Sequence, residues 1–255
     1  MVFWGISIWG IVLVTALVAA SLGMLYVIDR RMLSRSLRSL MALVVQMALA
    51  GFYVWVLYSL DNWLVNILWL VLMSAVVGYV SLDKVRLPWQ KFLPVMFASV
   101  LAGCLALGGS LLLVLRQPSA QYLFVPVMGI LLGDLLVSVT HALQAYIISL
   151  RSTVHHRLYM QGNGASHLEA VIPCVRRALR AALLPRFRQM SSPLLLALPV
   201  LACGMLMGGV PVGTAFVVAL SVVLASYAAT VLTTVLMLWL SDRYMFDGYG
   251  NFVSR

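Results

Sequence analysis

The sequence predicts an all-α protein, a polytopic bundle of about seven transmembrane helices. The chain of 255 residues is 63% hydrophobic and only 9% charged, and no water-soluble globule of this size hides so much apolar side chain. The apolar residues form continuous runs of about 20 residues, the length that a helix needs to cross a bilayer. Continuous runs favour helices over barrel strands, in which apolar and polar residues alternate.

Each predicted span is one of these apolar runs. The runs are Trp4–Ile28, Ser39–Leu60, Trp63–Leu82, Phe92–Leu115, Tyr122–Leu150, Pro193–Gly208 and Val212–Leu240. The sixth run is short, and glycines and a proline between 208 and 213 separate it from the seventh. A re-entrant hairpin is therefore the alternative interpretation of the last two runs, and whether 193–208 fully spans stays open.

The distribution of positive charge predicts the orientation. The formal net charge is +10, and every Lys and Arg except Arg116 lies after the first, third, fifth or seventh run. Because positively charged loops remain in the cytoplasm, we expect the N-terminus outside and the C-terminus inside a cell (inner) membrane. The charge also fits contact with anionic lipid. Since the basic residues flank spans rather than cover one soluble face, we expect no nucleic-acid partner.

The segment 151–192 is the only long polar stretch, and we treat 1–255 as one transmembrane domain that carries this cytoplasmic segment. The fifth helix is expected to continue to about Met160, before glycines at 162 and 164 end it. Ser166 and Glu169 fit a capping box, in which a hydroxyl and a carboxylate each accept a backbone N–H at the start of a helix.

This capping box predicts a short helix from Ser166. Pro173 is expected to kink it and to begin a second, basic helix that stops at Pro185, because proline disrupts a helix interior but suits a first turn. A short capped helix that projects from a bundle can sit in a groove of a cytoplasmic ATPase. The alternative is a loop helix that lies on the membrane surface.

Polar residues within the predicted spans are candidates for function. Asp134 is the only acidic residue deep in a span, and such a carboxylate usually faces the bundle interior, a cavity or a partner. His141 and Gln144 follow at i+7 and i+10, on the same helical face. Asp134 therefore marks a translocation path or a subunit interface, or else is a neutral, hydrogen-bonded structural residue. Gln46 is a further candidate for the path, with an interhelical hydrogen bond as the alternative.

Motifs for catalysis are absent from the sequence. It contains no H-E-x-x-H, no G-x-S-x-G and no phosphate-binding loop with its lysine. We therefore expect no enzymatic activity and no cofactor on this chain. The histidines at 155, 156 and 167 have no known metal-binding spacing, so the sequence leaves any metal site undefined.

Four groups of residues resemble the motifs of a known family. The groups are Gln46 to Phe52 with Asp61, Pro126 to Asp134, Gly164–Ser166 with Arg177–Pro185, and Leu198–Pro199 with Gly204 and Gly209. In order and spacing they resemble the FetB-type ABC permease family, whose members are described as iron exporters and whose plant relatives act in aluminium tolerance. The chain resembles a divergent member, because Asp134 stands where the family has asparagine.

The resemblance implies the membrane-spanning permease subunit of an ABC transporter. Such a subunit couples ATP hydrolysis on a separate ATPase chain, which binds the ATP, to the export of a substrate, here iron or another metal. It implies a homodimer with two ATPase subunits and Asp134 near the dimer axis. The residues implied to contact the ATPase are Gly164, Ala165, Ser166 and Glu169.

Two alternatives remain open. The first is an ATP-independent secondary transporter in which Asp134 and His141 form a proton relay. The inverted repeats of many such carriers are not evident in this sequence. The second is a membrane scaffold without transport activity, in which Asp134 is packed and dry.

Overall fold

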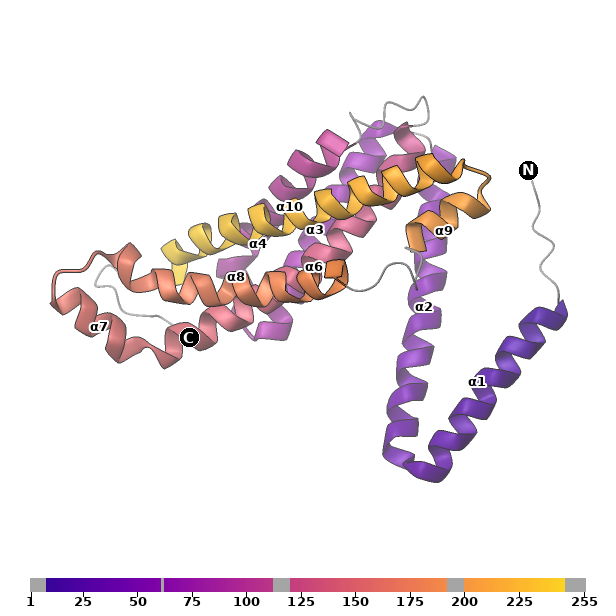
Figure 1. The fold of residues 1–255 in the computed structure, drawn as a ribbon, viewed down its shortest axis with the longest axis horizontal. Coiled ribbons are helices and arrows are strands. Elements are labelled where there is room, and N and C mark those ends of the chain that lie inside the picture. Colours follow the sequence, from indigo (N-terminus) through magenta and orange to yellow (C-terminus); the bar gives the residue numbers. More distant parts are fainter. Residues whose placement is uncertain (1–7, 61, 112–119, 192–199, 246–255) are drawn as a thin grey trace. The chain divides into compact units, whose positions relative to one another are not determined.

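The computed structural model describes residues 8–60, 62–111, 120–191 and 200–245, and nearly all of them are helical (Figure 1). The helices are α1 (Ile8–Ile28), α2 (Arg30–Leu60), α3 (Trp63–Val85), α4 (Trp89–Gly103), the π-helix η1 (Cys104–Gly108), α6 (Ala120–Ser152), α7 (Val154–Gly162), α8 (His167–Ser191), α9 (Val200–Met207) and α10 (Val212–Met245). No strand occurs in these residues, which confirms the predicted all-helical fold.

Five of the described helical stretches are long and apolar enough to cross a membrane. They are Arg30–Leu60, Trp63–Val85, Trp89–Leu111, Phe124–Ser152 and Val212–Arg243. These stretches correspond to the second, third, fourth, fifth and seventh predicted spans. The first predicted span contains α1, whose apolar part, Val12–Val27, is shorter.

The chain divides into two compact units, Met1–Leu60 and Asp61–Arg255. In the first unit, α1 and α2 form a hairpin joined at Asp29 (Figure 1). The Asp29 carboxylate accepts the backbone N–H of Arg31 at 2.7 Å, so it caps the start of α2. Most apolar side chains of both helices are exposed, as expected for helices whose solvent is lipid.

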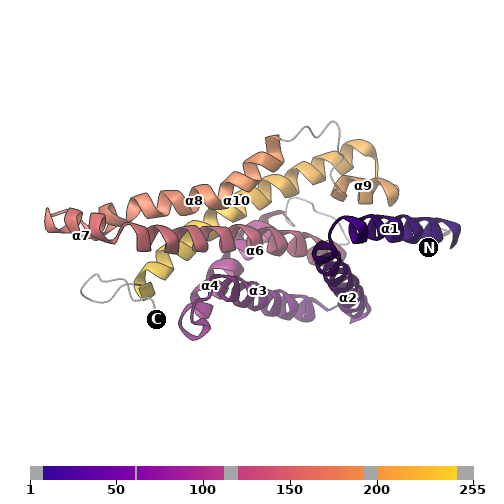
Figure 2. The ribbon, with the colours of Figure 1, turned by 90° about the horizontal axis from the view of Figure 1, so that it is seen from below.

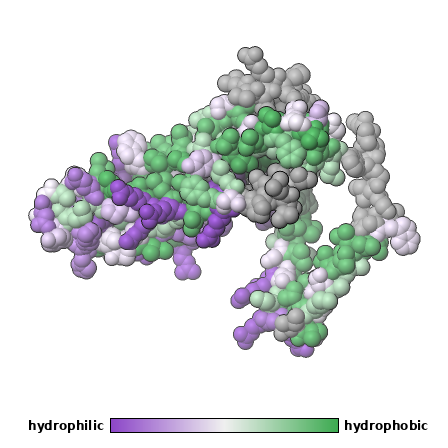
Figure 3. Space-filling model, viewed as in Figure 1, coloured by the Kyte–Doolittle hydropathy of each residue, from purple (hydrophilic) through white to green (hydrophobic). Residues whose placement is uncertain are grey.

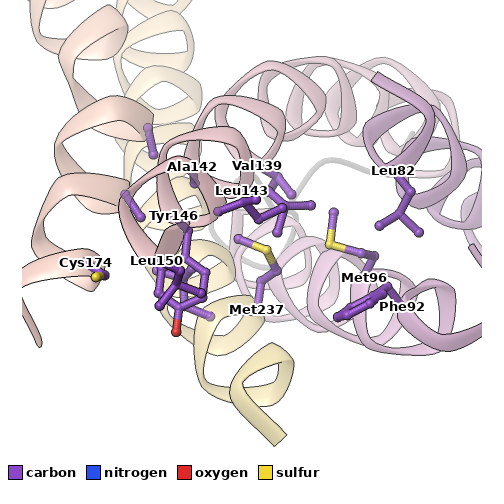
Figure 4. Close-up of a cluster of buried hydrophobic side chains, with 14 of the residues drawn as sticks. Leu82, Phe92, Met96, Val139, Ala142, Leu143, Tyr146, Leu150, Cys174 and Met237 are labelled. Atoms are coloured by element: carbon purple, nitrogen blue, oxygen red, sulfur yellow. The ribbon is translucent and has the colours of Figure 1, made fainter. Parts of the chain in front are cut away.

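The second unit is organised around α6. Helices α3, α4, α8 and α10 each pack against another helix of this unit, and all contribute to one apolar core with α6. Figure 4 shows part of this core, with Leu82 of α3, Met96 of α4, Tyr146 of α6 and Met237 of α10. The core therefore joins elements from both ends of the unit's sequence.

A close helix contact in this unit depends on one glycine. At Gly103, where α4 passes into η1, an added Cβ would overlap the Oγ1 of Thr233 on α10. The two helices are neighbours along this region. Glycine therefore permits the backbones of α4 and α10 to approach each other.

The segment 151–192 differs from the prediction in its helices. We predicted a kink at Pro173 and a stop at Pro185, whereas α8 continues without a break from His167 to Ser191. Each proline removes one backbone hydrogen bond, but α8 packs along α6 over much of its length (Figures 1 and 2). This tertiary contact outweighs the local cost. The small buried side chains of α8 in the shared core are Cys174, Ala178 and Ala182.

The connection between α6 and α8 contains one unpredicted break and one predicted break. The fifth span was expected to continue as one helix to about Met160, but α6 ends at Ser152 and α7 begins at Val154. At the break, Thr153 leaves the helical conformation, with φ −111° and ψ 19°, while its hydroxyl and its backbone N–H both donate to the Ser149 carbonyl, at 2.8 and 3.0 Å. The predicted break after Gly162 is confirmed.

The sixth predicted span is only partly described. Residues 193–199 lie outside the described residues, and α9 covers eight residues, Val200–Met207. At 1.5 Å per residue this described part of the predicted span is about 12 Å long. A turn at Gly209, whose φ is +82°, leads from α9 into α10.

We expect Gly103→Ala to destabilise the protein by about 1 to 3 kcal/mol, because the new methyl group forces α4 away from Thr233. The measurement is the thermal unfolding midpoint of the purified protein in detergent. Gly109→Ala is the matched control, since nothing lies within 4 Å of a Cβ there and alanine favours the helix. Equal midpoints for the two variants would contradict the close contact.

Candidate functional site

Asp134, in the middle of α6, forms an ion pair with Arg186 of α8. The distance from Arg186 Nη2 to Asp134 Oδ1 is 2.7 Å. The hydroxyl of Ser226, on α10, donates a hydrogen bond to the other carboxylate oxygen, Oδ2. The side chains of Arg186 and Asp134 are only 12% and 30% exposed. One carboxylate therefore connects three helices, α6, α8 and α10.

This geometry changes two expectations from the sequence. Arg186 was counted with the cytoplasmic basic residues, but it contacts a residue inside the apolar stretch Phe124–Ser152. The end of α8 thus lies beside the spanning part of α6. The second expectation concerned Asp134, for which a neutral, hydrogen-bonded structural residue was the alternative prediction. A guanidinium keeps its charge in proteins, so an ionised carboxylate is the partner that compensates it.

The other predicted polar residues do not meet at this ion pair. His141 is exposed on α6, and seven helical residues separate it from Asp134 by about 10 Å along the axis. Gln144 is half-buried still further along the same helix, and Gln46 is exposed on α2 in the first unit. The partners that the structure gives Asp134 are Arg186 and Ser226. The Asp134–His141 pair proposed as a relay is therefore not in direct contact.

The turn between α7 and α8 contains the predicted capping box. Gly164 has a φ of +89°, a conformation that favours glycine. The backbone N–H of Ser166 donates to Glu169 Oε2 at 2.8 Å, and the backbone N–H of Glu169 donates to the Ser166 hydroxyl at 3.3 Å. These reciprocal bonds confirm the capping box. The hydrogen bonds from the Ser166 backbone and side chain lower the pKa of the Glu169 carboxyl.

A second carboxylate holds the start of α8, and the sequence analysis did not identify it. His167 Nε2 lies 3.1 Å from Asp242 Oδ2, near the end of α10. The Tyr146 hydroxyl, on α6, donates to Asp242 Oδ1 at 3.3 Å. Gln161 Nε2 is 3.4 Å from His167 Nδ1. The residue that follows the capping serine is thereby connected to α6, α7 and α10.

Buried hydroxyls line one face of α10, which the sequence analysis also missed. Apart from the adjacent Thr233 and Thr234, they are spaced by three, four or seven residues, as on a single helical face, and this spacing was a readable signal. Among the described residues, the hydroxyls of Thr233, Thr234 and Ser241 have no hydrogen-bond partner. The buried hydroxyl residues of this face are Ser226, Thr230, Thr233, Thr234 and Ser241.

Apolar side chains are exposed at the tip that α7 and α8 form. Leu158 and Tyr159 of α7 are 49% and 70% exposed, and Leu168 of α8 is 67% exposed. Hydrophilic residues gather over the rest of this end of the hairpin (Figure 3).

The described residues contain no group of three or more His, Cys, Asp or Glu that could hold a metal ion.

Comparison with known proteins identifies the family. Residues 8–246 match the family model described as "Uncharacterised protein family (UPF0014)". The chain belongs to the UPF0014 family. It is 25% identical over 170 residues to a UPF0014 membrane protein of a Synechocystis strain, an alignment that covers 65% of each protein. No solved structure matches this UPF0014 chain.

The family and the helices agree on the environment of the chain. This UPF0014 protein is a multi-pass membrane protein, as predicted from its composition, and its apolar helices are suited to a cell membrane. The predicted orientation of the two termini and the predicted roles of Asp134 and the 164–169 turn stay predictions.

The capping box predicts a pH dependence of the start of α8. Because the pKa of Glu169 is lower in the folded protein than in the unfolded chain, its stabilisation is present at neutral pH and is lost as the pH falls through the lowered pKa. Glu169→Gln should remove this dependence, whereas Ser166→Ala, which keeps the backbone N–H that donates to Glu169, should only weaken it and should raise amide hydrogen exchange at His167–Ala170 about fivefold. Exchange measured by mass spectrometry over pH 3 to 7 tests both effects. A pH-independent start of α8 in the wild-type chain would contradict them.

The ion pair predicts strong non-additivity. Asp134→Leu and Arg186→Met should each destabilise the protein by about 2 to 3 kcal/mol, because each leaves a charge unpaired among apolar groups. The double variant should be close to wild type, since it leaves no charge behind. Unfolding midpoints in detergent measure the cycle, and additive losses would show that the two side chains do not interact.

Proposed function

We propose that this chain is the membrane-spanning permease subunit of an ABC transporter, which couples ATP hydrolysis by a separate ATPase subunit to substrate export. The observation that carries the proposal is the α7–α8 tip, defined as residues 158–169. It presents exposed apolar side chains beside a capped helix start. The four groups of motifs that resemble FetB-type permeases support the same role. Iron or another metal is the cargo class that this resemblance suggests.

The tip is suited to receive a partner. Its turn is fixed by the αL glycine at 164 and by the reciprocal Ser166–Glu169 bonds, so little ordering is required when a partner binds. Leu168 projects from the first turn of α8 with most of its surface exposed. In the proposed complex, Leu168, Leu158 and Tyr159 enter an apolar groove of the ATPase.

The position of the tip also suits transmission of movement. Helix α8 leads directly from the tip to the core that it shares with α6. A displacement imposed on the first turn of α8 is therefore imposed on a helix already packed into the bundle. The proposed assembly is a homodimer with two ATPase subunits, with Asp134 near the dimer axis.

Purification of the protein from its native membrane in mild detergent tests the proposal. Mass spectrometry should identify a stoichiometric ATPase with a phosphate-binding loop. Leu168→Ser should reduce the amount of bound ATPase at least about tenfold, since one well-packed apolar anchor contributes on the order of 2 kcal/mol. Met190→Ser, which alters another exposed apolar side chain of α8 away from the tip, is the control and should retain the ATPase.

Two results would contradict this function. The first is the absence of any ATPase from preparations in which the wild-type chain is intact. The second is equal ATPase retention by the wild-type chain and by a variant lacking 164–172.

A further inference from the structure

Helix α8 is one continuous element between the tip and the interior of the bundle. It has 25 residues, so at 1.5 Å per residue it is about 37 Å long. Its first residue, His167, follows the capping serine, and Arg186 lies in its last two turns. The same helix therefore carries both the proposed ATPase contact and the ion pair with Asp134.

The apolar contact between α8 and the core is made mainly by small side chains. Among the described side chains of α8 the buried ones are Ala170, Val171, Cys174, Ala178 and Ala182, and all but Val171 are small. Small side chains let helices approach closely, but they interlock less than large ones, so they oppose sliding along the helix axis weakly. Polar contacts hold α8 in register instead. They are His167 with Asp242 at its start, Arg177 with Ser149 in the middle and Arg186 with Asp134 at its end.

The contact at the end of α8 is the hardest to release. Arg186 and Asp134 are mostly buried beside apolar helices, and separating them there leaves two uncompensated charges. Ser226 holds the second oxygen of the same carboxylate. When α8 moves, the arrangement that keeps these charges paired is one in which α6 and α10 follow it.

We propose that the Asp134–Arg186 ion pair is the contact through which movement of α8 reaches α6 and α10, with Arg186 as the positioning residue. The inference rests on the proposed function, because the movement originates at an ATPase bound to the tip. It assigns Asp134 a mechanical role that depends on Arg186, instead of direct contact with the substrate. It also explains why the pair lies between α8 and the two longest helices of the second unit.

The test compares a neutral pair with matched controls. The neutral pair is Asp134→Leu with Arg186→Met, which removes the connection without leaving an unpaired charge. Arg186→Lys keeps the positive charge. Arg188→Met makes the same arginine-to-methionine change at an exposed position two residues further along α8. Each variant is purified with the ATPase in lipid nanodiscs. The measurements are bound ATPase, unfolding midpoint and the rate of ATP hydrolysis relative to the free ATPase subunit.

The expected result separates a mechanical role from a structural one. The neutral pair should bind the ATPase and unfold near the wild-type temperature, yet lose the part of the hydrolysis rate that depends on the permease. Arg186→Lys should retain more than half of that part, and Arg188→Met all of it. A purely structural pair would predict normal hydrolysis in the neutral pair, because its stability is restored.

The possible failures are distinguishable. If the wild-type chain binds no ATPase, the proposed function fails, and this inference fails with it. If the wild-type chain binds the ATPase but the neutral pair hydrolyses ATP at the wild-type rate, only the inference is overturned. The inference is also overturned if the wild-type complex hydrolyses ATP no faster than the free subunit, or if Arg188→Met loses as much activity as the neutral pair.

Discussion

A positive charge placed among apolar helices must be compensated, and the arrangement of the second unit depends on how Arg186 meets this requirement. Asp134 compensates it at 2.7 Å, and Ser226 satisfies the remaining carboxylate oxygen. Neither charge is tolerable at that position alone. The pair therefore requires the end of α8 to lie against α6, beside α10.

With its end fixed in this way, α8 can remain a helix despite two internal prolines. Each proline costs a hydrogen bond, but the helix is supported along its length by the core that it shares with α6. The small residues Cys174, Ala178 and Ala182 of this core let the two backbones lie close together. Support from packing, more than intrinsic propensity, is the usual source of helix stability in proteins. A rigid α8 then connects the α7–α8 tip with the interior.

Helix α10 has polar groups beside both ends of α8. Ser226 lies at the ion pair, and Asp242 accepts the contacts of His167 and Tyr146 near the tip. Between these two levels, α10 carries the buried hydroxyl face and the close contact of Thr233 with Gly103 of α4. Helix α10 therefore has polar contacts with the α8 assembly at two levels, as the proposed transmission of movement from the tip requires.

The sequence by itself determined the features that arise from nearby residues. Long apolar runs predicted the spanning helices, and Ser166 with Glu169 predicted the capping box, because bilayer thickness and backbone capping act over single elements. The polar character of Asp134 was also evident, but its partner was not. Only the tertiary structure decided that Arg186, Ser226 and Asp242 meet their partners and that α8 continues through Pro173. The chain separations of these contacts, 92 residues for Ser226 with Asp134 and 75 for His167 with Asp242, leave no local pattern, and packing energy overrides the local signal of a proline.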